Sequence, residues 1–80
     1  MSHKEKAESA LREMKEAIVG FESDHKDGVI ASDVARELGL ESDFEGSQRN
    51  YLSWSVLGLL VNENRLRYEK RGRNRIYFVA

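Results

Sequence analysis

Hydrophobic residues recur every three or four positions through the first part of the chain, and this spacing predicts a helix over 3–22. Ser2 and Glu5 have the spacing of a capping box, in which each side chain satisfies a backbone N–H left free at a helix start. After the helix, a polar segment that ends in Asp27 and Gly28 predicts a turn. The stripe predicted to face the core consists of Ala7, Ala10, Leu11, Met14, Ala17, Ile18 and Phe21.

Two shorter elements are predicted next. The β-branched run at 29–31 indicates a strand, and a second helix is expected over 33–39, with Ser32 as its N-cap. Gly39 is suited to end this helix in a left-handed conformation. The buried side of the second helix is predicted to consist of Val34, Ala35 and Leu38.

A third helix is predicted over 48–62, with Ser47 as its cap. Its outer face carries the aromatic residues Tyr51 and Trp54 together with Gly58. Because glycine in a helix costs about 1 kcal/mol relative to alanine, Gly58 suggests that something approaches the backbone closely there. At 100° per residue, the opposite face, which is expected to pack on the other helices, carries Leu52, Val56, Leu57 and Leu60.

The C-terminal residues alternate between apolar and charged and predict a hairpin over 65–79. Asn64 is expected to end the preceding helix in a left-handed conformation. The tip is expected over 70–74, where Gly72 can take a positive φ. The hairpin face expected to cover the end of the core carries Leu66, Tyr68, Ile76 and Phe78.

These elements predict a single α+β domain over 1–80, and a hydrophobic content of 40% is sufficient for a folded core. The chain has no cysteine, which fits a reducing cytoplasm. No apolar run approaches the roughly 18 residues that cross a bilayer, so no membrane partner is expected. We therefore expect a cytoplasmic protein.

The charge is unevenly distributed along the chain. Residues 1–46 hold six Lys or Arg against twelve Asp or Glu, whereas residues 47–80 hold seven against two. A basic C-terminal side favours an anionic partner such as nucleic acid. A solvated mixture of charges is the alternative explanation.

The sequence offers little for catalysis. Ser53 and Ser55 have no histidine nearby in sequence to activate them, and the adjacent acids of the loop 41–46 are typical of a solvated surface. His3 and His25 lack the spacing of metal ligands. We therefore expect no enzyme activity, no cofactor and no small-molecule substrate.

Candidate binding residues lie at the start of the third helix and at the hairpin tip. Arg, Asn and Gln at such a helix start can read base edges in a major groove, and clustered cations are easier to explain if phosphates lie among them. Burial of Tyr51 and Trp54 and a charged hairpin edge that resists aggregation are the alternatives. The candidates are Ser47, Gln48, Arg49, Asn50, Tyr51, Trp54, Lys70, Arg71, Arg73 and Arg75.

The order helix, short strand, helix, turn, helix and basic hairpin resembles the winged helix-turn-helix family of DNA-binding domains. The stretches that carry the resemblance are IASDVARELGL, SVLGLLVNENRL and RLRYEKRGRNRIYFV. The resemblance implies that the third helix enters the major groove of double-stranded DNA, that the hairpin is a wing on the phosphates, and that the chain regulates transcription. Because some winged helices bind proteins, the alternative is a homodimer or protein partner on the outer face of the third helix, formed by Tyr51, Trp54, Gly58 and Val61.

Overall fold

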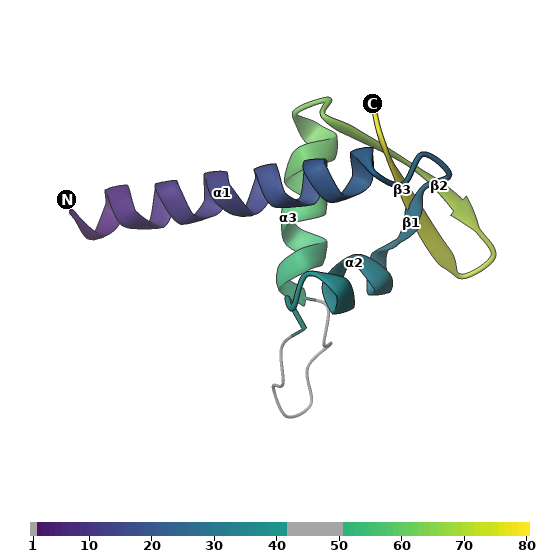
Figure 1. Cartoon of the computed structure of the whole chain (residues 1–80), viewed down its shortest axis with the longest axis horizontal. Helices are drawn as coiled ribbons and strands as arrows, with labels where there is room; N and C mark the ends of the chain where they lie inside the picture. Colours follow the sequence, from purple (N-terminus) through teal and green to yellow (C-terminus); the bar gives the residue numbers. More distant parts are fainter. Residues whose placement is uncertain (1, 42–50) are drawn as a thin grey trace.

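The computed structural model describes residues 2–41 and 51–80, and for Tyr51 it describes the backbone alone. Within these residues the chain forms three helices and a three-stranded antiparallel sheet (Figure 1), which confirms the predicted α+β class. The elements are α1 (His3–Ser23), β1 (Val29–Ile30), α2 (Ala31–Glu37), α3 (Tyr51–Asn62), β2 (Leu66–Arg71) and β3 (Asn74–Val79). The predicted start of the third helix before residue 51 lies outside the described residues.

Local signals in the sequence explain most of the element ends. The Ser2 hydroxyl accepts from the Glu5 backbone N–H at 3.1 Å, so the predicted capping box at the start of α1 is confirmed. Gly39, Asn64 and Gly72 have the predicted positive φ values of 67°, 62° and 62°. The predicted cap at Ser32 is wrong, because α2 begins at Ala31, two residues before the predicted start, and its N-cap is Ile30.

The strand order is β1-β3-β2, so β3 is the central strand. Residues that lie directly opposite each other in an antiparallel pair share a face of the sheet. Tyr68 lies opposite Tyr77, and Arg67 lies opposite Phe78. The predicted common face of Leu66, Tyr68, Ile76 and Phe78 is therefore wrong: Leu66 and Tyr68 share their face with Tyr77, while Ile76 and Phe78 lie on the other.

The core lies between the helices and the face of the sheet that carries Leu66 and Tyr77. Val56, Leu57 and Leu60 are buried there as predicted, but Leu52 is 44% exposed. Leu52 was placed wrongly because α3 is rotated so that Ser53, which is fully buried, takes the inner position. The buried apolar cluster consists of Ile18, Val29, Val34, Val56, Leu57, Leu60, Leu66 and Tyr77.

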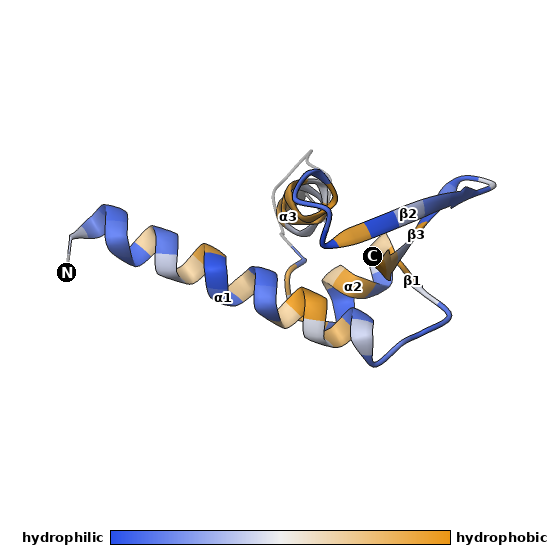
Figure 2. Ribbon diagram, turned by 90° about the horizontal axis from the view of Figure 1, so that it is seen from above, coloured by the Kyte–Doolittle hydropathy of each residue, from blue (hydrophilic) through white to orange (hydrophobic). Residues whose placement is uncertain are grey.

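Helix α1 packs on the domain through its C-terminal half alone. Ile18 is fully buried, and Met14 and Phe21 pack against the cluster. The first half of α1 extends away from the other described elements in both views (Figures 1 and 2). The predicted buried stripe is therefore wrong at the exposed residues Ala7, Ala10 and Leu11, because the helix is longer than the body it covers. It is also wrong at Ala17, which is exposed within the packed half because it lies about 100° round the helix from Ile18.

Gly28 lies where the turn after α1 passes over β3. Its φ is 87°, and a Cβ on it would lie 2.5 Å from Ile76 and 2.6 Å from Phe78. Both a left-handed backbone and the absence of a side chain are therefore required at this position. Gly58 differs, because a Cβ there would meet nothing within 4 Å in the described structure, so the close approach predicted at Gly58 is not found.

We predict that Gly28→Ala lowers the free energy of unfolding by about 2 to 3 kcal/mol, because it adds both backbone strain and a steric clash with β3. Urea denaturation followed by circular dichroism measures this change. Gly58→Ala is the matched control and should raise the stability by up to about 1 kcal/mol, since it adds helix propensity in open space. Equal effects of the two substitutions would contradict the packing described for Gly28.

Candidate functional site

The outer side of α3 meets the C-terminal hairpin at an arginine held between two aromatic rings. The Arg75 guanidinium lies 5.6 Å from the centre of the Trp54 ring and 4.8 Å from the centre of the Tyr68 ring. Both distances allow cation–π attraction, which restricts the arginine side chain. Trp54 is 44% exposed and Tyr68 is 42% exposed, so the rings hold Arg75 while keeping large surfaces open to solvent.

The strand register explains how these side chains meet. Arg75 lies opposite Lys70, and Tyr68 precedes Lys70 by two positions, so all three side chains are on the same face of the hairpin. Tyr77 lies opposite Tyr68 on that face, with a ring separation of 5.8 Å. Because Tyr77 is buried in the core, it anchors the exposed Tyr68 and, through it, Arg75.

A cleft of about 290 Å³ opens beside Trp54, between the start of α2 and the turn of the hairpin. Arg73 and Arg75 supply positive charge, while Ser32 and Asn74 supply polar groups that can donate hydrogen bonds. None of the described lining residues carries a carboxylate. The cleft therefore favours a negatively charged group. Its lining residues are Ile30, Ala31, Ser32, Trp54, Arg73, Asn74 and Arg75.

The structure separates the four predicted cations of the hairpin. Lys70, Arg73 and Arg75 form no ion pair with any residue that the structure describes. Arg71 lies on the opposite face from Arg75, and its guanidinium is 3.3 Å from a carboxylate oxygen of Glu69. The cleft beside Trp54 thus gathers Arg73 and Arg75 but not Arg71.

Five predicted residues at the start of the third helix have side chains outside the described part of the structure. Ser47, Gln48, Arg49 and Asn50 lie outside the described residues. Tyr51 begins α3, but its side chain is also outside the description. Trp54 is therefore the one candidate on the third helix whose side chain is placed, and its exposure excludes the buried alternative for this residue.

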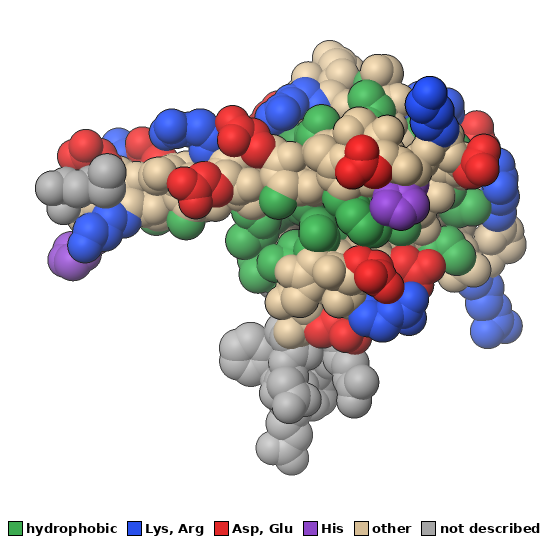
Figure 3. All heavy atoms as spheres, viewed as in Figure 1, with side chains coloured by type: hydrophobic (Ala, Val, Ile, Leu, Met, Phe, Trp, Pro, Cys, Tyr) green, Lys and Arg blue, Asp and Glu red, His purple; other side chains and the backbone are tan. Residues whose placement is uncertain are grey.

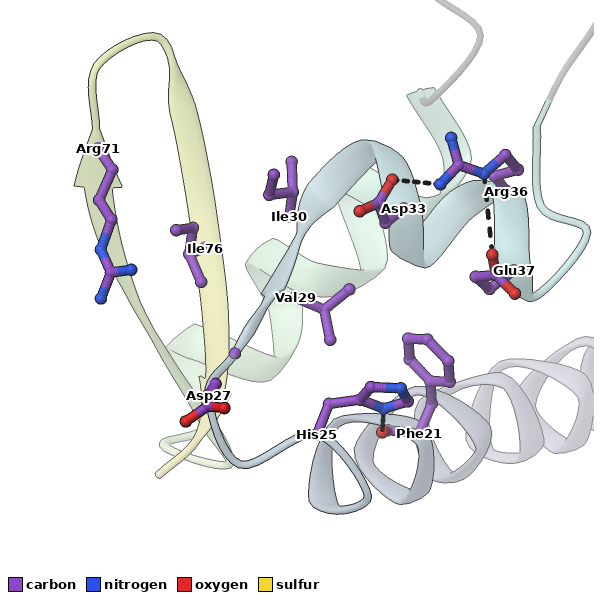
Figure 4. A pocket seen from close by; sticks show the side chains of 11 residues that line it. Phe21, His25, Asp27, Val29, Ile30, Asp33, Arg36, Glu37, Arg71 and Ile76 are labelled. Atoms are coloured by element: carbon purple, nitrogen blue, oxygen red, sulfur yellow. Dashed lines mark hydrogen bonds and ion pairs between the residues drawn. The ribbon is translucent and has the colours of Figure 1, made fainter.

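A second and larger cleft, of about 580 Å³, lies on the other face, between the end of α1, α2 and the hairpin (Figure 4). Arg71 faces it from β2. Opposite charges balance one another along the wall of this larger cleft, because Arg36 forms ion pairs with both Asp33 and Glu37. The His25 ring nitrogen Nδ1 lies 2.8 Å from the Phe21 carbonyl oxygen, so this histidine covers the end of α1. The cleft therefore lacks the single sign of charge that characterises the cleft beside Trp54.

Glu22 is a buried carboxyl group that the sequence analysis did not identify. It is 1% exposed, and neither carboxylate oxygen has a hydrogen-bond partner within the described part of the chain. Burial raises the pKa of Glu22 to about 7, although the charge of nearby His25 opposes this rise. Its position four residues after Ile18, on the same side of α1, was a signal in the sequence that Glu22 would be buried.

Three further searches give no positive result. Among residues 2–41 and 51–80, no group of three or more His, Cys, Asp or Glu side chains could hold a metal ion. No helix in the described part is both long and apolar enough to cross a membrane. Comparison with protein-family models, curated proteins and solved structures yields no match.

We predict that the stability of the protein decreases as Glu22 ionises. The carboxyl has a pKa of about 7 when folded against an ordinary value of 4.5, so its contribution is complete below about pH 4.5 and is lost as the pH rises to about 7. The loss should approach about 3 kcal/mol. Denaturation of Glu22→Gln at a series of pH values should lack this decline.

The exposed Glu16→Gln is the matched control and should keep the pH dependence of the unaltered protein. A decline that persists in Glu22→Gln would assign the pH dependence to another group.

Proposed function

We propose that the chain is a non-catalytic winged-helix module that binds double-stranded DNA and serves in transcription regulation. The observation that carries this proposal is the cleft beside Trp54, where Arg73 and Arg75 meet an exposed aromatic ring and no described lining residue carries a carboxylate. In the proposed complex α3 lies in the major groove, and the hairpin is a wing whose arginines contact backbone phosphates.

The way Arg75 is held supports phosphate binding. A free arginine loses rotamer freedom when it binds a ligand, and this loss reduces affinity. Trp54 and Tyr68 already restrict the Arg75 side chain through the faces of their rings. The N–H groups at the edge of a stacked guanidinium remain available for two parallel hydrogen bonds to a phosphate.

The outer side of α3 is also suited to close approach by a DNA groove. Gly58 is exposed and, in the described structure, a Cβ on it would meet nothing within 4 Å, so Gly58 itself places no side chain between the helix backbone and a partner. A B-form major groove is about 12 Å wide and admits one α-helix. Within the proposal, Ser47, Gln48, Arg49, Asn50 and Tyr51 contact the groove from the N-terminal end of the third helix.

Positive charge gathers at the hairpin end of the chain, although Arg67 and Arg71 lie on the opposite face of the sheet from Lys70 and Arg75. Residues 47–80 carry seven Lys or Arg against two Asp or Glu, and Lys and Arg side chains project from the hairpin end of the molecule in Figure 3. Nucleic acid would therefore approach this end, where Lys and Arg side chains outnumber Asp and Glu. The cytoplasmic location expected from a cysteine-free chain belongs to the same proposal.

A second candidate function is protein binding through the same outer face. The exposed rings of Trp54 and Tyr68 favour it, because exposed aromatic residues are enriched at protein interfaces. The two functions differ in their dependence on salt, since phosphate contacts weaken steeply with added salt while aromatic contacts do not.

We predict that replacing both Arg73 and Arg75 with Ala weakens binding to a mixed-sequence duplex about tenfold at low salt and lowers the salt slope by about 2. Fluorescence anisotropy of a labelled duplex measures both quantities. Arg71→Ala is the matched control on the other face of the hairpin and should have a smaller effect, because Glu69 already neutralises this arginine. No binding of the unaltered protein tighter than about 10⁻⁴ M at low salt would exclude DNA binding.

Trp54 is the single tryptophan of the chain, so its emission reports on this site alone. We predict that duplex DNA changes the intrinsic fluorescence in a saturable way that added salt reverses. The variant with Ala at positions 73 and 75 keeps the fluorophore and should lose most of this response. A fluorescence change that salt does not reverse would instead favour a site governed by stacking or by protein contacts.

A further inference from the structure

The cleft beside Trp54 has a basic part and an apolar part, and a phosphate group matches only the basic one. Arg73 and Arg75 come from the hairpin and carry the charge. The apolar surface comes from Ile30 and Ala31 at the start of α2 and from the Trp54 ring on α3. Because a phosphate is polar on every side, phosphate binding alone leaves the apolar part of the cleft without a partner.

Two polar side chains of the lining are also unoccupied. Ser32 and Asn74 are exposed, and their side chains form no hydrogen bond with any residue that the structure describes. The Ser32 hydroxyl and the Asn74 amide can each donate and accept a hydrogen bond. They therefore suit a ligand that presents donors and acceptors together along one edge, as a nucleobase does.

The size of the cleft restricts such a ligand to a single nucleotide. Its volume of about 290 Å³ corresponds to about ten water molecules at roughly 30 Å³ each. One base with its sugar phosphate has a volume of this order, whereas a base pair with both backbones is much larger. A base inside a duplex is also covered by the bases above and below it, so only an unpaired base can present its face to Trp54.

We propose that the cleft beside Trp54 binds one unpaired nucleotide of a DNA strand, with the base against the Trp54 ring and the phosphate at Arg73 and Arg75. This inference rests on the proposed binding of double-stranded DNA and adds to it a preference for duplexes that contain an unpaired base. Stacking of a base on an aromatic side chain typically raises affinity by roughly 5- to 150-fold.

The surface on which the base would stack is already formed. The Arg75 guanidinium lies over the Trp54 ring at 5.6 Å and over the Tyr68 ring at 4.8 Å. Bases stack on the planes of guanidinium groups as well as on aromatic rings, so Trp54 and Arg75 both offer a flat surface to the ligand. Because these contacts exist without a ligand, binding requires little further ordering of the two side chains.

The position of the cleft agrees with an unpaired nucleotide that belongs to a longer strand. Trp54 lies on α3, which is proposed to enter the major groove, and Arg73 lies in the turn of the hairpin, which is proposed to contact phosphates. The cleft is bounded by both elements. A strand that runs from the hairpin to α3 therefore passes the cleft, where one of its bases can turn inward if it has no pairing partner.

Fluorescence anisotropy of the full chain with two labelled duplexes tests the proposal. One duplex carries a single unpaired thymidine in the middle of one strand, and the other carries an abasic sugar phosphate at the same place, so their charges are equal. We expect the first to bind at least fivefold more tightly at both low and moderate salt, because the phosphate contacts are the same. Equal affinities would overturn the proposal, as would a preference that disappears when salt is added.

A fully paired duplex of the same sequence separates this proposal from the function on which it rests. If the paired duplex binds and the thymidine and abasic duplexes have equal affinities, the nucleotide site is overturned while the proposed DNA binding stands. If none of the three duplexes binds, both proposals are overturned.

Substitution of the stacking residue tests the assignment to Trp54. Trp54→Ala should reduce the ratio of the two affinities to about one, whereas Trp54→Phe should keep most of it, because a phenyl ring also stacks on a base. Leu59→Ala is the matched control: Leu59 is 40% exposed on the same helix and is not part of the cleft lining. Equal losses in Trp54→Ala and Leu59→Ala would overturn the assignment. Far-ultraviolet circular dichroism checks that each variant keeps its helices.

Thymidine 5′-monophosphate distinguishes a nucleotide within DNA from a free one. Its binding, followed by Trp54 fluorescence, should be weaker than about 10⁻³ M, because the free nucleotide lacks the neighbouring phosphates that the rest of the protein would contact. A dissociation constant below about 10⁻⁵ M would overturn the DNA source and assign the cleft to a free nucleotide.

Discussion

The turn at Gly72 and Arg73 determines which side of the sheet each hairpin side chain faces. Arg71 pairs with Asn74 across it, so the turn contains two residues, and Gly72 takes the positive φ that such turns need at their first position. One additional residue in the turn would shift the register and exchange the faces. Tyr77 would then leave the core, and Arg75 would lose its place between Trp54 and Tyr68. The core and the candidate binding site therefore depend on the same turn.

This dependence explains what the sequence could predict and what it could not. Helical periodicity and the Ser2 cap give α1, and periodicity gives α2 and the buried Val56, Leu57 and Leu60 of α3, because these features depend on neighbours within a few positions. The hairpin was predicted with a five-residue tip in place of two residues, and this error alone assigned Ile76 and Phe78 to the wrong face. The alternation within each strand was correct. The register of β2 against β3 was predicted wrongly, because the sequence of one strand does not specify which residue of the other strand lies opposite each of its own.

The packed length of α1 and the grouping of cations at the candidate site likewise depend on tertiary structure and do not follow from local sequence. The apolar stripe from Ala7 to Phe21 is continuous in sequence, and nothing in its spacing indicates where the body of the domain ends beneath it. The cations of the hairpin were recognisable from composition, yet the separation of Arg71 from Arg73 and Arg75 needed the strand register. The ion pairs of Glu69 with Arg67 and Arg71 likewise follow from their alternation onto one face.

Gly28 has a consequence for how the sequence can diverge. Its backbone lies against Ile76 and Phe78, so the turn after α1 and the central strand leave no volume for another residue type. The exposed residues before it, from Asp24 to Asp27, have no such restriction. During evolution this turn should therefore accept almost any polar composition while retaining glycine at its last position. A glycine directly before a short strand, matched to bulky apolar residues near the C-terminal end, is a signature by which distant relatives could be recognised when overall identity has been lost.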